Sequence, residues 1–200
     1  MPETEALLPR FRAAHTQVLG VSVDSVYSHA NWARDLGGIS FPLLSDFEPK
    51  GGMAKSYGLY LDGPGITDRA TVVIDSEGVV RYAASVGPGG RRTIADLAAE
   101  CEKVDAQASG LPDLPTGSGI DGVLYVKSKC GPSRSALLAR DNLHLDSIAV
   151  KNVSEDPAAH KELIEAAGKD QAPCLVSGGE AVLEAEQIVA RLAAAAAPLP

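Results

Sequence analysis

The sequence predicts an α/β protein made of two consecutive units of similar design. In residues 123–197, stretches of alternating and of helically spaced apolar residues give the order strand, helix, strand, helix, strand, strand, helix. Residues 3–104 give the same order without its opening strand. Between them lies a stretch rich in Gly, Pro and Ser, which is typical of a linker. We therefore expect domains at residues 1–108 and 120–200, joined by a linker at 109–119.

Composition and charge exclude several classes of partner. The net charge of the 200 residues is −8, and no basic region stands out that could neutralise phosphates. No apolar run approaches the roughly 20 residues of a membrane helix, and the first residues do not have the pattern of a signal peptide. We expect neither nucleic acid nor membrane as a partner.

The cysteines indicate the compartment. Three cysteines form an odd and sparse set, which suits functional thiols in a reducing cytoplasm better than a disulfide framework. Because no cysteines and histidines stand at zinc-ligand spacing, we expect no metal site.

The elements of both halves follow from apolar spacing and turn residues. In the first half we expect a helix at 3–15, a strand at 18–23, a helix opened by Ser25, an extended turn at 41–46, a short helix at 53–57, a hairpin of 70–75 with 79–83, and a helix at 93–104. In the second half we expect strands at 123–126 and 147–150, helices at 133–142 and 154–167, a hairpin of 172–177 with 180–183, and a helix at 184–197.

Cys130 is the residue around which the second half is organised. It follows an apolar strand and precedes Gly131-Pro132, where a helix begins. A thiol at a helix N-terminus is stabilised as thiolate by the partial positive charge there, and Lys127 and Lys129 act in the same direction. A small buried hydrophobe is the alternative, but this pattern favours a reactive thiol.

The first half resembles the peroxiredoxins of the alkyl hydroperoxide reductase and thiol-specific antioxidant group. The resemblance rests on Val18-Leu-Gly-Val-Ser-Val-Asp-Ser25, on His29 with Trp32, on Phe41-Pro-Leu-Leu-Ser-Asp46, and on Arg69 leading into Thr71-Val-Val-Ile-Asp75. It implies that Arg69 belongs to a peroxide site, where a permanent cation stabilises the thiolate and the leaving oxygen. Without the resemblance, the residues favour a surface ion pair of Arg69 with Asp68 or Asp75.

The motif that defines this family, Pro-x-x-x-Thr/Ser-x-x-Cys, does not occur in the sequence. The resemblance implies that the missing cysteine and the central strand before it would precede Met1, so we expect a peroxiredoxin-like half without its N-terminal part. Cys101 lies at core spacing on the last helix of this half, where a structural role is expected. Peroxidase activity of this chain is therefore not expected. Open strand edges favour self-association.

The second half is similar to glutaredoxins and to the glutathione-binding domain of glutathione transferases, on the strength of Cys130-Gly-Pro-Ser133, Gln171-Ala-Pro173 and Glu184-Ala-Glu-Gln-Ile188. Both halves are then thioredoxin-like folds, the first lacking its opening central strand. The similarity implies a glutathione site to which it assigns Lys127, Ser133, Ala172, Pro173 and Glu184. It also implies a cis bond before Pro173 and an inward-pointing Cys174. Ala185 stands where a serine is usual.

The expected function is that of a thiol-dependent antioxidant oxidoreductase acting on peroxide or mixed-disulfide substrates. Ser133 takes the place of a second cysteine, so Cys130 is predicted to perform monothiol–disulfide exchange. Glutathione is expected as co-substrate and no tightly bound cofactor is expected. Two alternatives stay open: a non-catalytic scaffold with a redox fold, and a monothiol glutaredoxin that carries an iron–sulfur cluster between two subunits.

Overall fold

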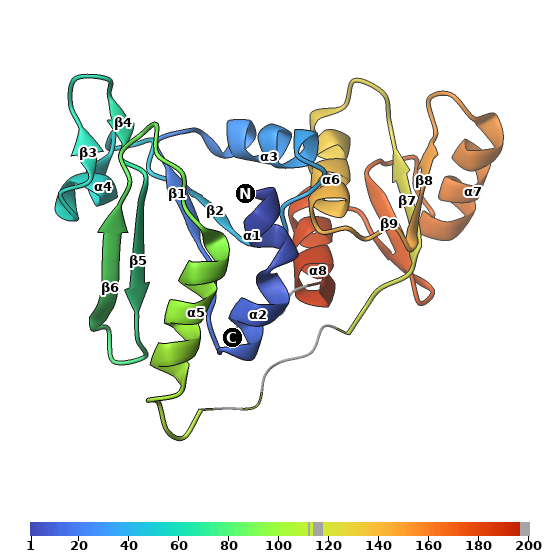
Figure 1. The fold of residues 1–200 in the computed structure, drawn as a ribbon. Coiled ribbons are helices and arrows are strands. Elements are labelled where there is room, and N and C mark those ends of the chain that lie inside the picture. The colour runs from blue at the N-terminus through green and yellow to red at the C-terminus, as the bar shows by residue number, and fades with distance from the viewer. Residues whose placement is uncertain (112, 114–117, 197–200) are drawn as a thin grey trace. The chain divides into compact units, whose positions relative to one another are not determined.

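The computed structural model describes residues 1–111, 113 and 118–196, and the chain divides into two compact units (Figure 1). The first unit lies within residues 1–29 and 41–114, and the second within 30–40 and 115–199. Residues 30–40, which the sequence assigns to the first half, group with the second unit. The predicted linker at 109–119 lies in part outside the described residues.

The second unit is built around a four-stranded sheet. Its elements are β7 (Gly122–Val126), α6 (Gly131–Asn142), β8 (Ile148–Asn152), α7 (Pro157–Ala167), β9 (Cys174–Ser177), β10 (Glu180–Val182) and α8 (Ala185–Ala196). The strand order is β10-β9-β7-β8. β7 pairs parallel with β8 and antiparallel with β9, so the first strand of the unit lies inside the sheet. The predicted order of elements is confirmed here.

Helices cover both faces of this sheet. Leu124 and Val126 of β7 pack with residues of α6 and α8, including Ala136 and Ile188. Tyr125, between them in sequence, packs on the other face with residues of α7. Successive side chains of a strand point to opposite faces, so a run of apolar residues is what a strand covered on both sides requires.

The first unit holds more and shorter elements. They are α1 (Pro2–Ala6), α2 (Leu8–Ala13), β1 (Gly20–Ser22), α3 (Val26–Asp35, which runs into residues of the second unit), β2 (Leu43–Ser45), α4 (Gly52–Ser56), β3 (Tyr60–Leu61), β4 (Ile66–Thr67), β5 (Ala70–Ile74), β6 (Val80–Ser85) and α5 (Ile94–Asp105). Phe11, Val73, Ala98 and Cys101 lie in one core cluster, which ties α2 and α5 to one face of β5.

Three local expectations for this unit are corrected. The helix expected at 3–15 is two helices, because Pro9 has no backbone N–H and is accommodated in the first turn of a new helix, α2. The segment 41–46 is not only a turn, since β2 within it pairs parallel with β1. The small hairpin of β3 and β4 was not predicted, because strands of two residues carry no periodicity.

His29, one of the residues on which the resemblance to peroxiredoxins rests, has a structural role. Its side chain is 7% exposed, and its Nε2 lies 2.8 Å from the hydroxyl of Ser22. That hydroxyl donates to Asp24 Oδ2 at 2.6 Å. The three side chains together fix the corner between β1 and the start of α3.

The strands of the first unit do not join into one sheet. β1 pairs with β2, β5 pairs with β6, and no described strand lies between β1 and β5, in line with the order of elements that the sequence predicts. No helix within the described ranges is long and apolar enough to cross a membrane.

Candidate thiol site

Cys130 lies where β7 passes into α6, as the sequence predicts. It is the N-cap residue of α6, with extended backbone angles, and Pro132 lies in the first helical turn. Its carbonyl accepts from the backbone N–H of Arg134 at 3.0 Å. The side chain is half-buried and the thiol is free. The thiol is thereby held beside the unpaired N–H groups of a helix N-terminus, a place that favours negative charge.

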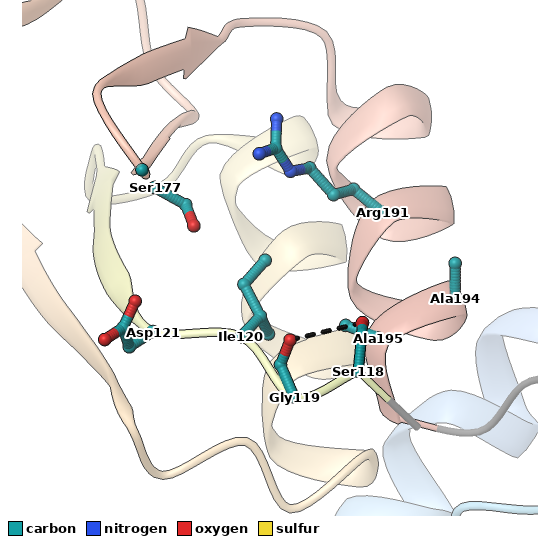
Figure 2. Close-up of a pocket in the computed structure, with 9 residues that line it drawn as sticks. Ser118, Gly119, Ile120, Asp121, Ser177, Arg191, Ala194 and Ala195 are labelled. Carbon is teal, nitrogen blue, oxygen red and sulfur yellow. Dashed lines mark hydrogen bonds between the residues drawn. The ribbon is translucent and has the colours of Figure 1, made fainter. Parts of the chain in front are cut away.

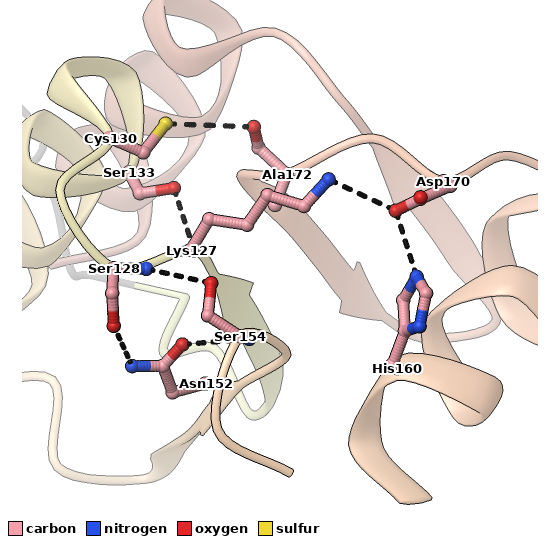
Figure 3. Close-up of polar contacts among 9 residues, drawn as sticks. All are labelled: Lys127, Ser128, Cys130, Ser133, Asn152, Ser154, His160, Asp170 and Ala172. Carbon is pink, nitrogen blue, oxygen red and sulfur yellow. Dashed lines mark hydrogen bonds and ion pairs between the residues drawn. The ribbon is translucent and has the colours of Figure 1, made fainter. Parts of the chain in front are cut away.

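The loop before Cys130 is held by hydrogen bonds to residues of α6, of β8 and of the turn that follows β8 (Figure 3). Ser133 accepts from the backbone N–H of Lys127 at 3.1 Å, and Ser154 accepts from the N–H of Ser128 at 3.1 Å. The amide of Asn152 donates to the hydroxyl of Ser128 at 2.8 Å. Lys129, next to the cysteine, has a φ of 55°, in the left-handed region that non-glycine residues seldom adopt. The loop is therefore fixed by its surroundings rather than by local preference.

The segment before β9 forms the opposite wall of the site. The Cys130 sulfur lies 4.0 Å from the carbonyl oxygen of Ala172, and Figure 3 shows the two groups facing each other. The Ala172–Pro173 peptide bond is cis, as the similarity to glutaredoxins implied. Pro173 itself is buried.

Lys127 makes a contact that the sequence did not predict. Its Nζ lies 3.0 Å from Asp170 Oδ1, and His160 Nε2 lies 3.0 Å from the same oxygen. Hydrogen bonds from Lys127 and then from His160 hold the pKa of Asp170 below its usual value. The Asp170 carboxylate thus fixes Lys127 at the edge of the site. An incoming anion would have to share the Lys127 ammonium group with Asp170.

Glu184 lies at the start of α8, and its carbonyl accepts from the N–H of Ile188 at 2.9 Å. Its exposed carboxylate accepts from the side-chain amide of Gln171 at 3.2 Å. Gln171 precedes Ala172, so Glu184 is connected to the wall opposite the thiol. The structure therefore brings together Lys127, Cys130, Ala172, Pro173 and Glu184.

Ser133 is the exception among the predicted glutathione residues. Its side chain is 0% exposed, and its hydroxyl is used by the backbone of Lys127. Because the Ser133 hydroxyl is buried, the expected contact between it and glutathione is corrected. The hydroxyl instead stabilises the turn between β7 and α6. The sequence did not predict that Asp170, His160 and Gln171 lie at the site. The opposite charges of Lys127 and Asp170 were visible in the sequence, but their proximity depends on the fold.

The other two cysteines are core residues. Cys101 is 4% exposed on α5, and Cys174 is 0% exposed on β9. Burial raises the pKa of both thiols. The inward position expected for Cys174 is confirmed, and Cys101 packs in the core as expected.

Arg69 lies in the first unit, directly before β5, with an exposed side chain. The ion pairs expected from the residues alone are absent from the described structure. Asp75 pairs with Arg81, and Asp68 accepts from the backbone N–H of Arg69 and the hydroxyl of Ser85. The side chain of Arg69 thus stays available for an anion.

A pocket of about 370 Å³ lies at the other end of the second unit's sheet (Figure 2). Gly119 and Asp121, before β7, and Ser177, at the end of β9, line it, whereas Cys130 follows the end of β7. Arg191 in its wall is paired with Glu180 at 2.8 Å. The pocket holds no thiol, so we do not assign the redox chemistry to it. Within the described ranges, no three His, Cys, Asp or Glu side chains are grouped so that they could hold a metal ion.

Comparison with known proteins identifies the class of the first unit. Residues 1–83 match the AhpC/TSA family. Alkyl hydroperoxide reductase E of Mycobacterium tuberculosis (strain ATCC 25618 / H37Rv) is 39% identical over 82 residues, which cover 41% of this chain and 53% of that protein. The chloroplastic 2-Cys peroxiredoxin BAS1 of Spinacia oleracea is 34% identical over 109 residues, which cover 52% of this chain and 40% of that protein.

Among solved structures, Mycobacterium tuberculosis AhpC matches with 25% identity and a TM-score of 0.47, over 52% of this chain and 63% of that one. The chain spans about half the length of the curated relatives it matches. Residues 1–83 thus form a domain that matches the AhpC/TSA family.

Proposed function

We propose that this protein is a thiol-dependent antioxidant oxidoreductase in which Cys130 performs monothiol–disulfide exchange with glutathione. The proposal pairs the peroxiredoxin-family domain with a glutaredoxin-like second unit, so that both units are thioredoxin-like. The observation that carries it is the position of Cys130, a free, half-buried thiol at the N-cap of α6 whose sulfur is 4.0 Å from the Ala172 carbonyl.

The reaction needs one protein thiol and balances without an internal disulfide. The Cys130 thiolate attacks the glutathione sulfur of a mixed disulfide, R–S–S–G. A bond forms between the Cys130 sulfur and the glutathione sulfur, and the S–S bond of the mixed disulfide breaks, so that the thiolate R–S⁻ leaves and takes up a proton. A second glutathione thiolate then attacks the same sulfur, which releases oxidised glutathione and restores the Cys130 thiolate.

Residues near the thiol support the assignment of glutathione as its co-substrate. We assign the backbone of Ala172 to the cysteine part of the tripeptide and Glu184 to its γ-glutamyl amino group. We assign Lys127, which is paired with Asp170, to its glycine carboxylate. Opposite charges at both ends orient the ligand so that its sulfur meets Cys130. We assign peroxide reduction neither to Cys130 nor to the first unit, where Cys101 is buried and Arg69 is only a cation left from the peroxide site that the resemblance implies.

The test is the reduction of a peptide–glutathione mixed disulfide by the full chain in the presence of reduced glutathione. We expect Cys130→Ser to abolish turnover and Ser133→Cys to retain part of it. Glu184→Gln should raise KM about fivefold with kcat little changed, since a surface charge contact contributes up to about 1 kcal/mol. Glu186→Gln, a matched change in the first turn of α8, should leave KM unaltered.

A non-catalytic scaffold would give no rate above the reaction of free glutathione. Equal turnover by wild-type protein and Cys130→Ser would refute the proposal. If Glu186→Gln raised KM as much as Glu184→Gln, the effect would be a nonspecific effect of charge. The contact assigned between Glu184 and the γ-glutamyl amino group would then be wrong.

A further inference from the structure

The Lys127 ammonium group, which we assign to the glycine carboxylate of the ligand, already has a carboxylate partner in this chain. Its Nζ donates to Asp170 Oδ1 at 3.0 Å, and Figure 3 shows the lysine side chain extended toward that carboxylate. Asp170 lies two residues before Ala172, whose carbonyl oxygen faces the Cys130 sulfur. The competing acid is therefore part of the same wall that a ligand on the thiol would contact.

Asp170 is held in its charged form and in one position. Hydrogen bonds from Lys127 and then from His160 lower the pKa of its carboxyl group, so that the group is ionised at neutral pH. His160, on α7, places its Nε2 3.0 Å from the same Oδ1 that Lys127 contacts. Two donors from different elements thus keep the negative charge beside the Lys127 ammonium group.

The two charged ends of the thiol site consequently differ. At one end, the exposed carboxylate of Glu184 accepts from the side-chain amide of Gln171 at 3.2 Å, a neutral partner that leaves its charge uncompensated. At the other end, Lys127 and Asp170 together carry no net charge. A ligand carboxylate there is attracted by the ammonium group and repelled by the Asp170 carboxylate. Both side chains are partly exposed, so solvent screens the small remainder.

We propose that Asp170 is a specificity-determining residue, which makes the thiol site indifferent to the glycine carboxylate of glutathione and able to take γ-glutamyl thiols with a neutral C-terminal end equally well. This inference rests on the proposed function and narrows it, because selectivity then comes from the γ-glutamyl end through Glu184. Asp170 acts through Lys127 and touches no reacting atom.

The test compares two disulfide substrates that differ in one group. One is a peptide–glutathione mixed disulfide, and in the other the glycine carboxylate is replaced by a carboxamide. With the full chain at pH 8 and reduced glutathione held constant, the wild-type KM values for the two should agree within about twofold. Asp170→Asn should lower KM for the carboxylate form about fivefold and leave KM for the amide form unchanged, because Lys127 is then free to bind an anion.

Two further variants make the assignment specific. Glu165→Gln removes a carboxylate that is paired with Lys161 on the surface of α7, and it should leave the ratio of the two KM values as in wild type. Lys127→Gln added to Asp170→Asn should return the ratio to within about twofold, since the gain requires both the free ammonium group and the ligand carboxylate. The kcat values should change little, because Cys130 performs the same exchange with both disulfides.

Three results would overturn the inference while Cys130-dependent turnover, and with it the proposed function, remained. The first is a wild-type KM for the carboxylate form more than about twofold below that for the amide form. The second is an Asp170→Asn protein with the KM ratio of wild type. The third is an equal fall of both KM values in that variant, which would mean a rearranged wall and not a released charge. Absence of Cys130-dependent turnover with either disulfide would refute the proposed function and this inference together.

Discussion

Cys130 differs from the other two cysteines in exposure and in the groups around it. Cys101 and Cys174 are enclosed by core side chains, and burial raises the pKa of both thiols, so they stay protonated at neutral pH. Cys130 is half-buried at a helix N-terminus with its sulfur directed at a backbone carbonyl. We therefore expect Cys130 to be the most reactive of the three thiols.

Alkylation rates test this difference. In the native chain at pH 7, iodoacetamide should label Cys130 at least about tenfold faster than Cys101 or Cys174, because the thiolate is the nucleophile and the other two are inaccessible. Mass spectrometry of the digested protein gives the three rates. Equal rates in the folded protein would contradict the assignment, and equal rates in urea would serve as the control.

The residues of the site were predictable from the sequence to the extent that they depend on local order. A strand, a cysteine and a Gly-Pro pair place the thiol at a helix start. Contacts across the fold were not predictable, because the carboxylate of Asp170 reaches Lys127 only when the segment before β9 lies beside the end of β7. Ser133 was misread, since sequence alone does not tell a buried hydroxyl from an exposed one.

At the level of elements, the N-cap of α7 and the loop before Cys130 hold the site of the second unit in place. α7 begins at Asp156, whose carboxylate accepts from the N–H of Ala158 at 2.8 Å, with Pro157 at the first helical position. The sequence predicted that this helix begins at Ser154 and not at Asp156, because serine and aspartate are both common N-cap residues. The hydroxyl of Ser154 is instead bonded to the N–H of Ser128, and so supports the loop before Cys130.

Replacing the cap should destabilise α7 without touching the thiol. Asp156→Ala should lower the free energy of unfolding of the second unit by about 1 kcal/mol, and Asp156→Asn should retain most of it. Glu165→Ala, on the surface of the same helix, should change it by less than about 0.5 kcal/mol. Hydrogen exchange of residues 158–167 in increasing urea measures all three. An Asp156→Ala protein as stable as wild type would show that the cap is dispensable.

For the whole molecule, the sequence predicted the element order of the second unit, whereas in the first unit it missed the split of the first helix and the strands β2, β3 and β4. Strong apolar runs and turn residues define β7, β9 and α8, and long-range pairing there follows from a central strand covered on both faces. In the first unit, short strands such as β2, β3 and β4 depend on tertiary contacts that no periodicity reveals. The unit boundaries also differ from the sequence division, because residues 30–40 group with the second unit.

Residues 1–83 match the AhpC/TSA family, and the second unit contains Cys130, to which we assign the thiol chemistry. This division makes the second unit responsible for the proposed glutathione chemistry. Its function then depends on a single covalent intermediate, the mixed disulfide of glutathione with Cys130.

That intermediate is the most direct test. The full chain is incubated with oxidised glutathione at pH 7, quenched with acid and mapped by mass spectrometry. We predict one glutathione per chain, attached at Cys130 and lost on addition of excess reduced glutathione, with Cys101 and Cys174 unmodified. Attachment at Cys101 or Cys174 instead, or no attachment to the native chain, would contradict the central claim.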